Sequence, residues 1–325
     1  MNLDPNLTDL THGEEYPLVL RVKQEFTEAV AQTHGVDARL VLPNNGSNGS
    51  LLTILSAYAV KALSEGMKPT IVYDVPQYFR TVHIARQFQY ERIEIPRDAE
   101  LEFDAAAYLA ALERKPTLAV LTTPNNPTGK AIPDTDLDAI LRALPDETVA
   151  LIDRTLTNLD SELPTEELLG YQGKVIVLHS FSKSHHLSAS RVGYAVTNSE
   201  EVADYVRPKL NLGFNVDGLR AGMAALRDTS RPEEVRKRIR ASLEALDEAA
   251  TLPGVRYFPS RSNYAVLQLP EGQSANHLRT FMEEKGFAIM AGPEIGMRDR
   301  YVRLHMTGAR EIREFVSHLG IYLKK

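Results

Sequence analysis

Short apolar runs, each followed by turn-forming or polar residues, recur through the first two thirds of this 325-residue chain. Each run is rich in Val, Ile and Leu, which is typical of strands buried on both faces of a parallel sheet. The segments between the runs have helical spacing. The chain is therefore predicted to form an α/β fold around a mostly parallel sheet. The predicted strands are 70–73, 118–121, 149–152 and 175–178.

The pattern changes after Asn198, where long helical segments precede strand-like and helical segments in the order strand, helix, strand, strand, helix. That order is typical of a smaller α+β domain. We predict an N-terminal arm and helix over 1–30, a large domain over 31–230 and a small C-terminal domain over 231–325. The predicted helices are 18–32, 51–65, 208–226, 232–252, 275–285 and 309–319, and the later strands are 264–267, 287–289 and 301–305.

Composition limits the possible functions. A hydrophobic content of 43% and a charged content of 25% are typical of a globular protein, and the net charge of -6 gives no electrostatic support for binding nucleic acid or an anionic membrane. The absence of cysteine excludes disulfides, thiolate metal sites and a cysteine nucleophile. The N-terminus lacks the pattern of a signal peptide, and no apolar run approaches the ~20 residues that span a bilayer. We expect a cytoplasmic location.

The turns after the predicted strands carry the side chains that could perform chemistry. In an open parallel sheet, ligands are bound by loops at the carboxyl ends of the strands. Tyr78 follows the first run, Asn126 lies in the turn after the second, Asp153 follows the third, and Ser180 to Lys183 follow the fourth. Together these turns supply a lysine amine, a carboxylate, an amide, hydroxyls and an aromatic ring.

This combination matches the requirements of pyridoxal phosphate (PLP). The cofactor needs an amine for its aldehyde, an anion beside its pyridine nitrogen and a donor to its phenolic oxygen. It also needs an aromatic face and a phosphate site, which a helix N-terminus and an arginine can form together. The glycine- and asparagine-rich turn 44–50 precedes a predicted helix, and Arg191 follows Lys183 by eight residues.

The chain resembles fold-type I PLP enzymes, in particular class I/II aminotransferases of the histidinol-phosphate aminotransferase type, from about Tyr16 to the C-terminus. The motifs that carry the resemblance are Asn125-Asn126-Pro127-Thr128-Gly129, Ser180-Phe181-Ser182-Lys183 with Arg191-Val192-Gly193-Tyr194, and Tyr301-Val302-Arg303-Leu304. The resemblance implies a mostly parallel seven-stranded sheet in a large PLP-binding domain, a small α+β domain, a homodimer and an amino acid or related amine as substrate.

The resemblance also implies a role for each candidate residue. Lys183 would form a Schiff base with PLP and then transfer the substrate's Cα proton. Arg303 would bind the substrate α-carboxylate in a two-pronged contact, which would also explain an arginine in an otherwise apolar strand. Asp153 would pair with the pyridine nitrogen, Asn126 would donate to the phenolic oxygen, and Tyr78 would stack on the ring. The residues implied to bind the phosphate are Gly46, Ser47, Asn48, Ser180, Ser182 and Arg191, with Tyr16 from the neighbouring subunit.

The sequence departs from the family pattern near the predicted cofactor. Leu156 stands where the resemblance leads us to expect a tyrosine that shares the phenolic oxygen with Asn126, and Thr155 or Thr157 could replace its hydroxyl. The N-terminal segment lacks the usual acidic-asparagine-proline loop, and His185 and His186 follow Lys183 with no assigned role. The histidine pair has no other ligand cluster, so no metal site is expected. These departures leave open a PLP-dependent decarboxylase, cyclase or oxidase, or a non-catalytic PLP-binding regulator.

Overall fold

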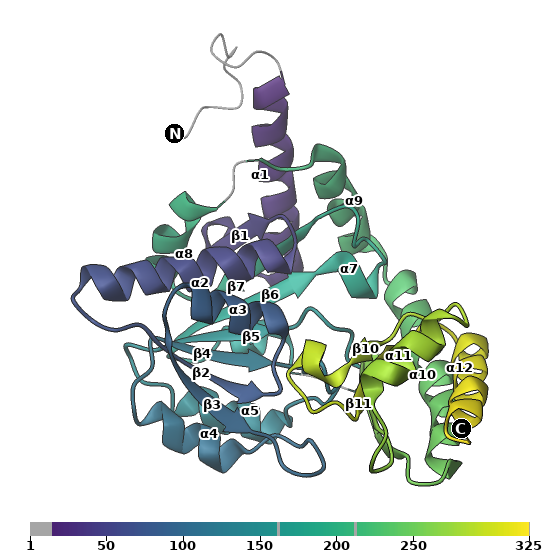
Figure 1. The fold of residues 1–325 in the computed structure, drawn as a ribbon. Helices are drawn as coiled ribbons and strands as arrows, with labels where there is room; N and C mark the ends of the chain where they lie inside the picture. The colour runs from purple at the N-terminus through teal and green to yellow at the C-terminus, as the bar shows by residue number, and fades with distance from the viewer. Residues whose placement is uncertain (1–14, 161–162, 211–212, 325) are drawn as a thin grey trace.

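A seven-stranded sheet forms the centre of the computed structural model, which describes residues 15–160, 163–210 and 213–324. The strand order is β1-β7-β6-β5-β4-β2-β3, and only β7 runs opposite to the others (Figure 1). The predicted α/β class with a mostly parallel sheet of seven strands is confirmed. The strands are β1 Val41–Asn44, β2 Thr70–Val75, β3 Glu91–Pro96, β4 Leu118–Thr122, β5 Val149–Asp153, β6 Lys174–Ser180 and β7 Gly193–Thr197.

Helices cover both faces of this sheet because successive strand residues alternate between two apolar clusters. Ile71 and Leu118 face α2, α3 and α8, whereas Val72 and Ala119 face α4, α5 and α6. Both clusters are almost free of solvent, which accounts for the unbroken apolar runs in the sequence. These helices are α2 Ser47–Ser64, α3 Phe79–Gln87, α4 Ala105–Leu112, α5 Asp134–Arg142, α6 Thr165–Leu168 and α8 Glu200–Val206.

A third cluster joins α1 (Glu15–His34) and α9 (Val216–Arg227) to the β1–β7 side of the sheet. Phe26 of α1 is fully buried in it against Phe181, which begins the short helix α7 (Phe181–Ser184). The two long helices lie side by side in Figure 1, at the end of the molecule where the N-terminus lies. They pack against Phe181, at the start of the segment that contains Lys183.

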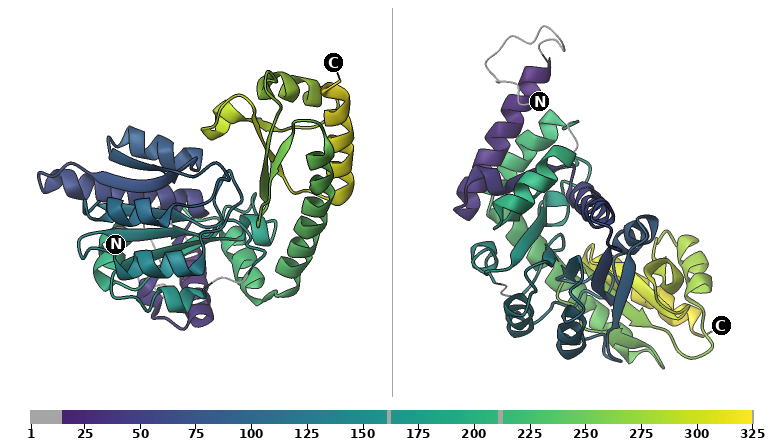
Figure 2. Two further views of the ribbon diagram at one scale, coloured as in Figure 1. Left: turned by 90° about the horizontal axis from the view of Figure 1, so that it is seen from below. Right: turned by 90° about the vertical axis from the view of Figure 1, so that its left-hand side faces the viewer.

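The C-terminal part has a separate four-stranded antiparallel sheet, ordered β10-β11-β9-β8, with its own apolar cluster (Figure 2). The helices α10, α11 and α12 contribute to this cluster. The elements are α10 Ser230–Asp247, β8 Arg256–Phe258, β9 Tyr264–Gln268, α11 Ala275–Glu283, β10 Met290–Ala291, β11 Tyr301–His305 and α12 Ala309–Tyr322. The short 3-10 helices are η1 Ala38–Leu40, η2 Arg207–Lys209, η3 Glu248–Thr251 and η4 Gly292–Ile295.

Several elements differ from the sequence prediction. The strand predicted over 287–289 is wrong: Phe287 N–H donates to the Met282 carbonyl and Gly286 has a φ of +84°, so this segment ends α11, and β10 begins at Met290. The helix predicted over 208–226 is present only from Val216, where α9 begins. Of the described residues before it, 208–209 belong to a short 3-10 helix and 213–215 are not helical. Strands β1, β3, β7 and β8 were not predicted. The domain boundary between residues 230 and 231 stays a prediction. Among the described helices, none combines the length and the apolar character that a membrane span needs.

Candidate active site

A cavity of about 240 Å³ lies where the loops after β2, β4, β5 and β6 meet residues of the second sheet. Nine of the twelve predicted site residues line it. Gly46 and Ser180 lie beside the cavity but not on its wall, and the side chain of Tyr16, in the first turn of α1, lies outside the described residues. The nine residues on the wall are Ser47, Asn48, Tyr78, Asn126, Asp153, Ser182, Lys183, Arg191 and Arg303.

Lys183 is positioned by the abrupt change from β6 to α7. Ser180 ends the strand and caps the helix: its Oγ accepts from the Ser182 N–H at 3.2 Å and donates to Ser182 Oγ at 2.9 Å. This turn directs the lysine into the cavity, where Nζ lies 5.5 Å from the centre of the Tyr264 ring. The lysine is therefore held on a short helix directly attached to the central sheet.

Asp153 ends β5 as a buried carboxylate, with 7% of its surface exposed. Burial raises the pKa of this carboxyl, and the hydrogen bonds from Thr155 oppose that shift; the Thr155 N–H donates to Asp153 Oδ1 at 2.9 Å. Asp153 forms no ion pair with the other described residues. A protonated pyridine nitrogen would supply the cation that this carboxylate lacks, so the site fits the cofactor at this end.

An anion site lies at the N-terminus of α2. Gly46 is the N-cap with a φ of +75°, and a Cβ there would lie 2.9 Å from Arg191 Nη2. The arginine is held by its own contacts, since Nη1 donates to the Ser188 carbonyl at 2.8 Å and Nη2 to the Asn45 carbonyl at 3.3 Å. A helix N-terminus beside an arginine is suited to a phosphate. The backbone conformation at position 46, with its positive φ, favours glycine.

Arg303 faces the opposite side of the cavity from β11. Its Nη1 donates to Asn126 Oδ1 at 2.9 Å, and its guanidinium carbon lies 4.1 Å from the centre of the Tyr264 ring. Burial lowers the pKa of Arg303, and the arginine forms no ion pair with the other described residues. A half-buried cation without a carboxylate partner favours binding of an anionic group from a ligand.

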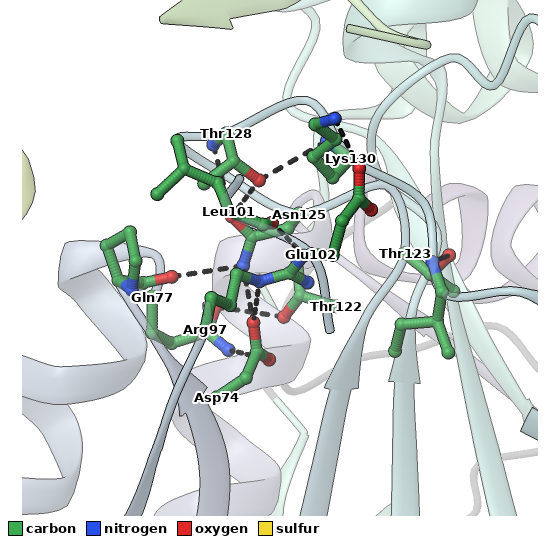
Figure 3. Close-up of polar contacts among 12 residues, drawn as sticks. Asp74, Gln77, Arg97, Leu101, Glu102, Thr122, Thr123, Asn125, Thr128 and Lys130 are labelled. Atoms are coloured by element: carbon green, nitrogen blue, oxygen red, sulfur yellow. Dashed lines mark hydrogen bonds and ion pairs between the residues drawn. The ribbon is translucent and has the colours of Figure 1, made fainter. Parts of the chain in front are cut away.

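A buried ion pair supports the loops that contain Asn126 and Tyr78 (Figure 3). Arg97 Nε donates to Asp74 Oδ2 at 2.6 Å, and both side chains are almost completely buried. Asn125 Nδ2 donates to the same carboxylate oxygen at 3.0 Å and to the Pro76 carbonyl at 3.1 Å. Asp74, at the end of β2, therefore holds the residue before Asn126 in place.

The same carboxylate reaches the Tyr78 loop through Gln77. Gln77 Nε2 lies 3.4 Å from Asp74 Oδ1, and Gln77 Oε1 accepts from the Tyr78 N–H at 2.7 Å and from Thr122 Oγ1 at 2.9 Å. The Tyr78 hydroxyl donates to Asn48 Oδ1 at 3.0 Å. One buried carboxylate thus links the loops on two sides of the cavity, a connection that was not predicted from the sequence.

The two histidines after Lys183 do not line the cavity. His185 Nδ1 lies 2.9 Å from Ser184 Oγ, and its ring packs on Phe181. His186, at a φ of +58°, accepts a hydrogen bond from Arg238 at 2.5 Å. Burial lowers the pKa of both imidazoles. Both histidines therefore make structural contacts at the edge of the site, and the described residues contain no group of three or more His, Cys, Asp or Glu placed to bind a metal.

Tyr264 is the main residue of the cavity wall that the sequence did not indicate. An aromatic residue at the start of an apolar strand is typical of a core, so its residue type gave no signal. Leu156 and Thr155 also line the cavity, whereas Thr157 is buried away from it. The wall thus includes a tyrosine from the second sheet and a leucine where the resemblance led us to expect a tyrosine.

Comparison with known proteins identifies relatives over nearly the whole chain. The family model for aminotransferase class I and II matches residues 16–319. A histidinol-phosphate aminotransferase from Chlorobaculum tepidum is 28% identical over 81% of this chain and 72% of its own. The fold is shared with L-threonine-O-3-phosphate decarboxylase from Porphyromonas gingivalis, with a TM-score of 0.79, 19% identity and 98% coverage of both chains.

A further structure with this fold contains the cofactor. Histidinol-phosphate aminotransferase from Sinorhizobium meliloti, in complex with pyridoxal-5'-phosphate, has a TM-score of 0.76 and 22% identity, covering 93% of this chain and 82% of its own. In this chain, the lysine, the isolated carboxylate and the helix N-terminus with its arginine surround one cavity. The chain belongs to the family of class I and II aminotransferases and is a PLP-dependent aminotransferase.

Proposed function

We propose that this aminotransferase acts on an amino acid whose α-carboxylate is bound by Arg303. The observation that carries the proposal is that Lys183, Asp153 and Arg303 line one cavity, with the carboxylate and the guanidinium both lacking an ion-pair partner among the described residues. Such isolated buried charges are costly unless ligands complete them. The pyridine nitrogen of PLP would pair with Asp153, and the α-carboxylate of the substrate would pair with Arg303.

The proposed roles of the residues follow from their places in the cavity. PLP, when bound, supplies an electron sink that weakens the substrate Cα–H bond. Asp153 keeps the pyridine nitrogen protonated, and Asn126 donates to the phenolic oxygen. Lys183 Nζ would act as the general base that takes the substrate Cα proton, and as the acid that gives the proton up again. Because Arg303 fixes the carboxylate, the Cα–H bond is directed toward Lys183.

The phosphate is proposed to bind at the N-terminus of α2. Arg191 provides the charge, and Ser47 and Ser182 on the cavity wall provide hydroxyls. Tyr78 is proposed to stack on the ring, because its hydroxyl is tied to Asn48 at the same end of the cavity. Gly46 and Ser180 act indirectly: the glycine leaves room for Arg191, and the serine positions Ser182.

Histidinol phosphate is the first amine to test, because relatives of this chain are named for it. It has no carboxylate, so its phosphate would have to occupy the place of the anion at Arg303. A decarboxylase is the second candidate. The observation that favours it is Leu156 on the cavity wall, which removes the tyrosine expected beside the phenolic oxygen and so alters control of the proton at Cα.

The test is a single-turnover reaction of the PLP-bound protein with individual amino acids, phosphorylated amino acids and histidinol phosphate. Aminotransfer predicts a change in cofactor absorbance to that of the amine form. One 2-oxo acid should be released per site from an amino acid, and one ketone from histidinol phosphate. Matched decarboxylated amines should react at least ~10-fold more slowly than the amino acids, because they lack the group that binds Arg303. Carbon dioxide and an amine as products would support the decarboxylase, and no product from any substrate would contradict both candidates.

We also propose that the protein is a homodimer that pairs through α2. This helix exposes Leu52, Val60 and Leu63, which have 39%, 53% and 60% of their surfaces accessible. Their spacing places them on one helix face, and Met67 and Phe79 are exposed as well. Phe79 also lines the cavity. An apolar stripe of this kind favours a symmetric contact with a second copy, which would then lie beside the active site.

Replacing Val60 and Leu63 together by glutamate is expected to shift the protein from dimer to monomer, because two charges would be buried in an apolar contact. Analytical ultracentrifugation measures the change, and transaminase activity should fall with it. Glutamate at Ile321, which is 50% exposed on α12, is the control and should leave the dimer intact. A wild-type protein that is monomeric and fully active would contradict the proposal.

A further inference from the structure

We propose that Tyr264 supplies the hydroxyl that is missing at position 156, and that it donates to the PLP phenolic oxygen together with Asn126. The proposal rests on the proposed placement of PLP in the cavity. It assigns a catalytic role to a residue of the second sheet, which the family resemblance did not indicate. Tyr264 would thereby couple the C-terminal part of the chain to the electronic state of the cofactor.

The first step is that residue 156 cannot perform the role expected of a tyrosine. Leu156 lines the cavity and is 8% exposed, but its side chain has no donor. Thr157 is buried off the cavity wall, and Thr155 lies beside Asp153, at the end proposed for the pyridine nitrogen. Neither threonine is therefore well placed to reach the phenolic oxygen from the lysine side of the ring.

The second step is the position of Tyr264 near both groups proposed to hold adjacent substituents of the ring: its ring lies near Lys183, and Arg303 connects it to Asn126. Lys183 Nζ lies 5.5 Å from the centre of the tyrosine ring. Arg303 stacks on the same ring at 4.1 Å and donates to Asn126 Oδ1 at 2.9 Å. In PLP, the aldehyde and the phenolic oxygen are on neighbouring ring carbons. A tyrosine that lies near Lys183 and shares Arg303 with Asn126 is therefore a candidate donor at the edge of the ring where the missing hydroxyl would act.

The third step is that the Tyr264 ring is fixed while its hydroxyl is available. The ring packs edge-on against His305 at 5.4 Å, in direct register across β9 and β11. The hydroxyl forms no hydrogen bond with another described residue, although the residue is 8% exposed and lines the cavity. A largely buried tyrosine usually has a partner for its hydroxyl. The phenolic oxygen of bound PLP would provide one.

The backbone of Tyr264 is also joined to the loop that contains Asn126. A Cβ at Gly129 would lie 2.2 Å from the Tyr264 carbonyl oxygen, and Gly129 has a φ of +72°. The Gly129 carbonyl accepts from the Arg261 N–H at 2.9 Å. The close approach of these two segments requires glycine. It joins the segment of Tyr264 to the loop of Asn126, the residues of the two donors proposed to share one oxygen.

Replacing Tyr264 by phenylalanine tests the proposal through the pH titration of the absorbance of the lysine-bound cofactor. A donor to the phenolic oxygen stabilises the deprotonated state, in which that oxygen is more negative, so its loss should raise the observed pKa. We expect a rise of about one to two pH units and a decrease in kcat of about 10- to 100-fold. PLP should remain attached to Lys183, because the ring and its packing are retained.

The decisive variant adds Leu156→Tyr to Tyr264→Phe, which should restore the titration toward that of the wild type by returning a hydroxyl to the expected place. Tyr301→Phe is the matched control, since the Tyr301 hydroxyl is bound to Gln268 at 2.9 Å and Tyr301 does not line the cavity. An unchanged titration in Tyr264→Phe would overturn the proposal, as would a shift that arises in Thr155→Val instead. Absence of lysine-bound PLP in the wild type would instead contradict the proposed function.

Discussion

Replacement of Lys183 by alanine is expected to abolish transamination while PLP remains bound without a covalent link. The phosphate site around Arg191 and the carboxylate of Asp153 do not depend on the lysine amine, so cofactor affinity should persist. Loss of the proton carrier alone removes about 10²- to 10⁴-fold in rate, and loss of the amine that binds the aldehyde adds to it. We expect a decrease in kcat of at least ~10⁴-fold.

Borohydride reduction followed by peptide mass spectrometry measures the covalent link directly. The wild type should carry a pyridoxyl group on Lys183, and the alanine variant should carry none. Lys174→Ala is the control, because Lys174 begins the same strand at its far end, where it pairs with Glu201 on the surface. A pyridoxyl group on any other lysine of the wild type would contradict the assignment.

The residues nearest the proposed cofactor could be predicted because sequence order places them there. Parallel strands end at one edge of a sheet, so Asp153 and Lys183, which follow neighbouring strands, must lie close together. Their short strands were recognisable from unbroken apolar runs. The family motifs supplied Asn126, Arg191 and Arg303, and all five line the same cavity.

The edge strands could not be predicted because neither contains an unbroken apolar run. In β3, Glu94 and Arg92 point to solvent, so the strand contains no apolar run. Strand β1 contains Pro43, which disfavours a strand assignment from sequence but is tolerated at the edge of the sheet. Sheet position, which is a property of the whole fold, decided both cases.

Long-range contacts around the site were also beyond the sequence. Tyr264 lies near Lys183 only because the second sheet packs against the first. From sequence alone, an aromatic residue in a strand that lines a cavity cannot be told from one that lies in the core. Asp74 and Arg97 are 23 positions apart and have no motif in common. Their pairing follows from the parallel register of β2 and β3, in which Val75 lies opposite Pro96.

Replacing Arg97 by methionine is expected to lower the free energy of unfolding by about 3–5 kcal/mol, because it leaves the Asp74 carboxylate buried without its cation. Among the described residues, only Asn125 and Gln77 would still form side-chain hydrogen bonds with Asp74, and both are neutral. Urea unfolding at saturating PLP measures the change. Bound PLP adds the same amount to the free energy of unfolding of every variant whose PLP affinity is unchanged. Arg92→Met is the control: its ion pair with Glu94 is exposed and should contribute less than ~1 kcal/mol.

The double variant Arg97→Met with Asp74→Asn distinguishes the effect of the buried charge on stability from the effect of the hydrogen bonds that Asp74 makes to the two loops. Removing both charges should recover most of the lost stability, because no buried ion remains. Activity should not recover to the same extent. An amide at position 74 must present its NH₂ toward either Gln77 Nε2 or Asn125 Nδ2, two donors, so one of the loops that hold Tyr78 and Asn126 loses its anchor. Full activity in the double variant would show that the pair serves stability alone; a kcat decreased despite recovered stability would show that Asp74 positions the cofactor-binding loops.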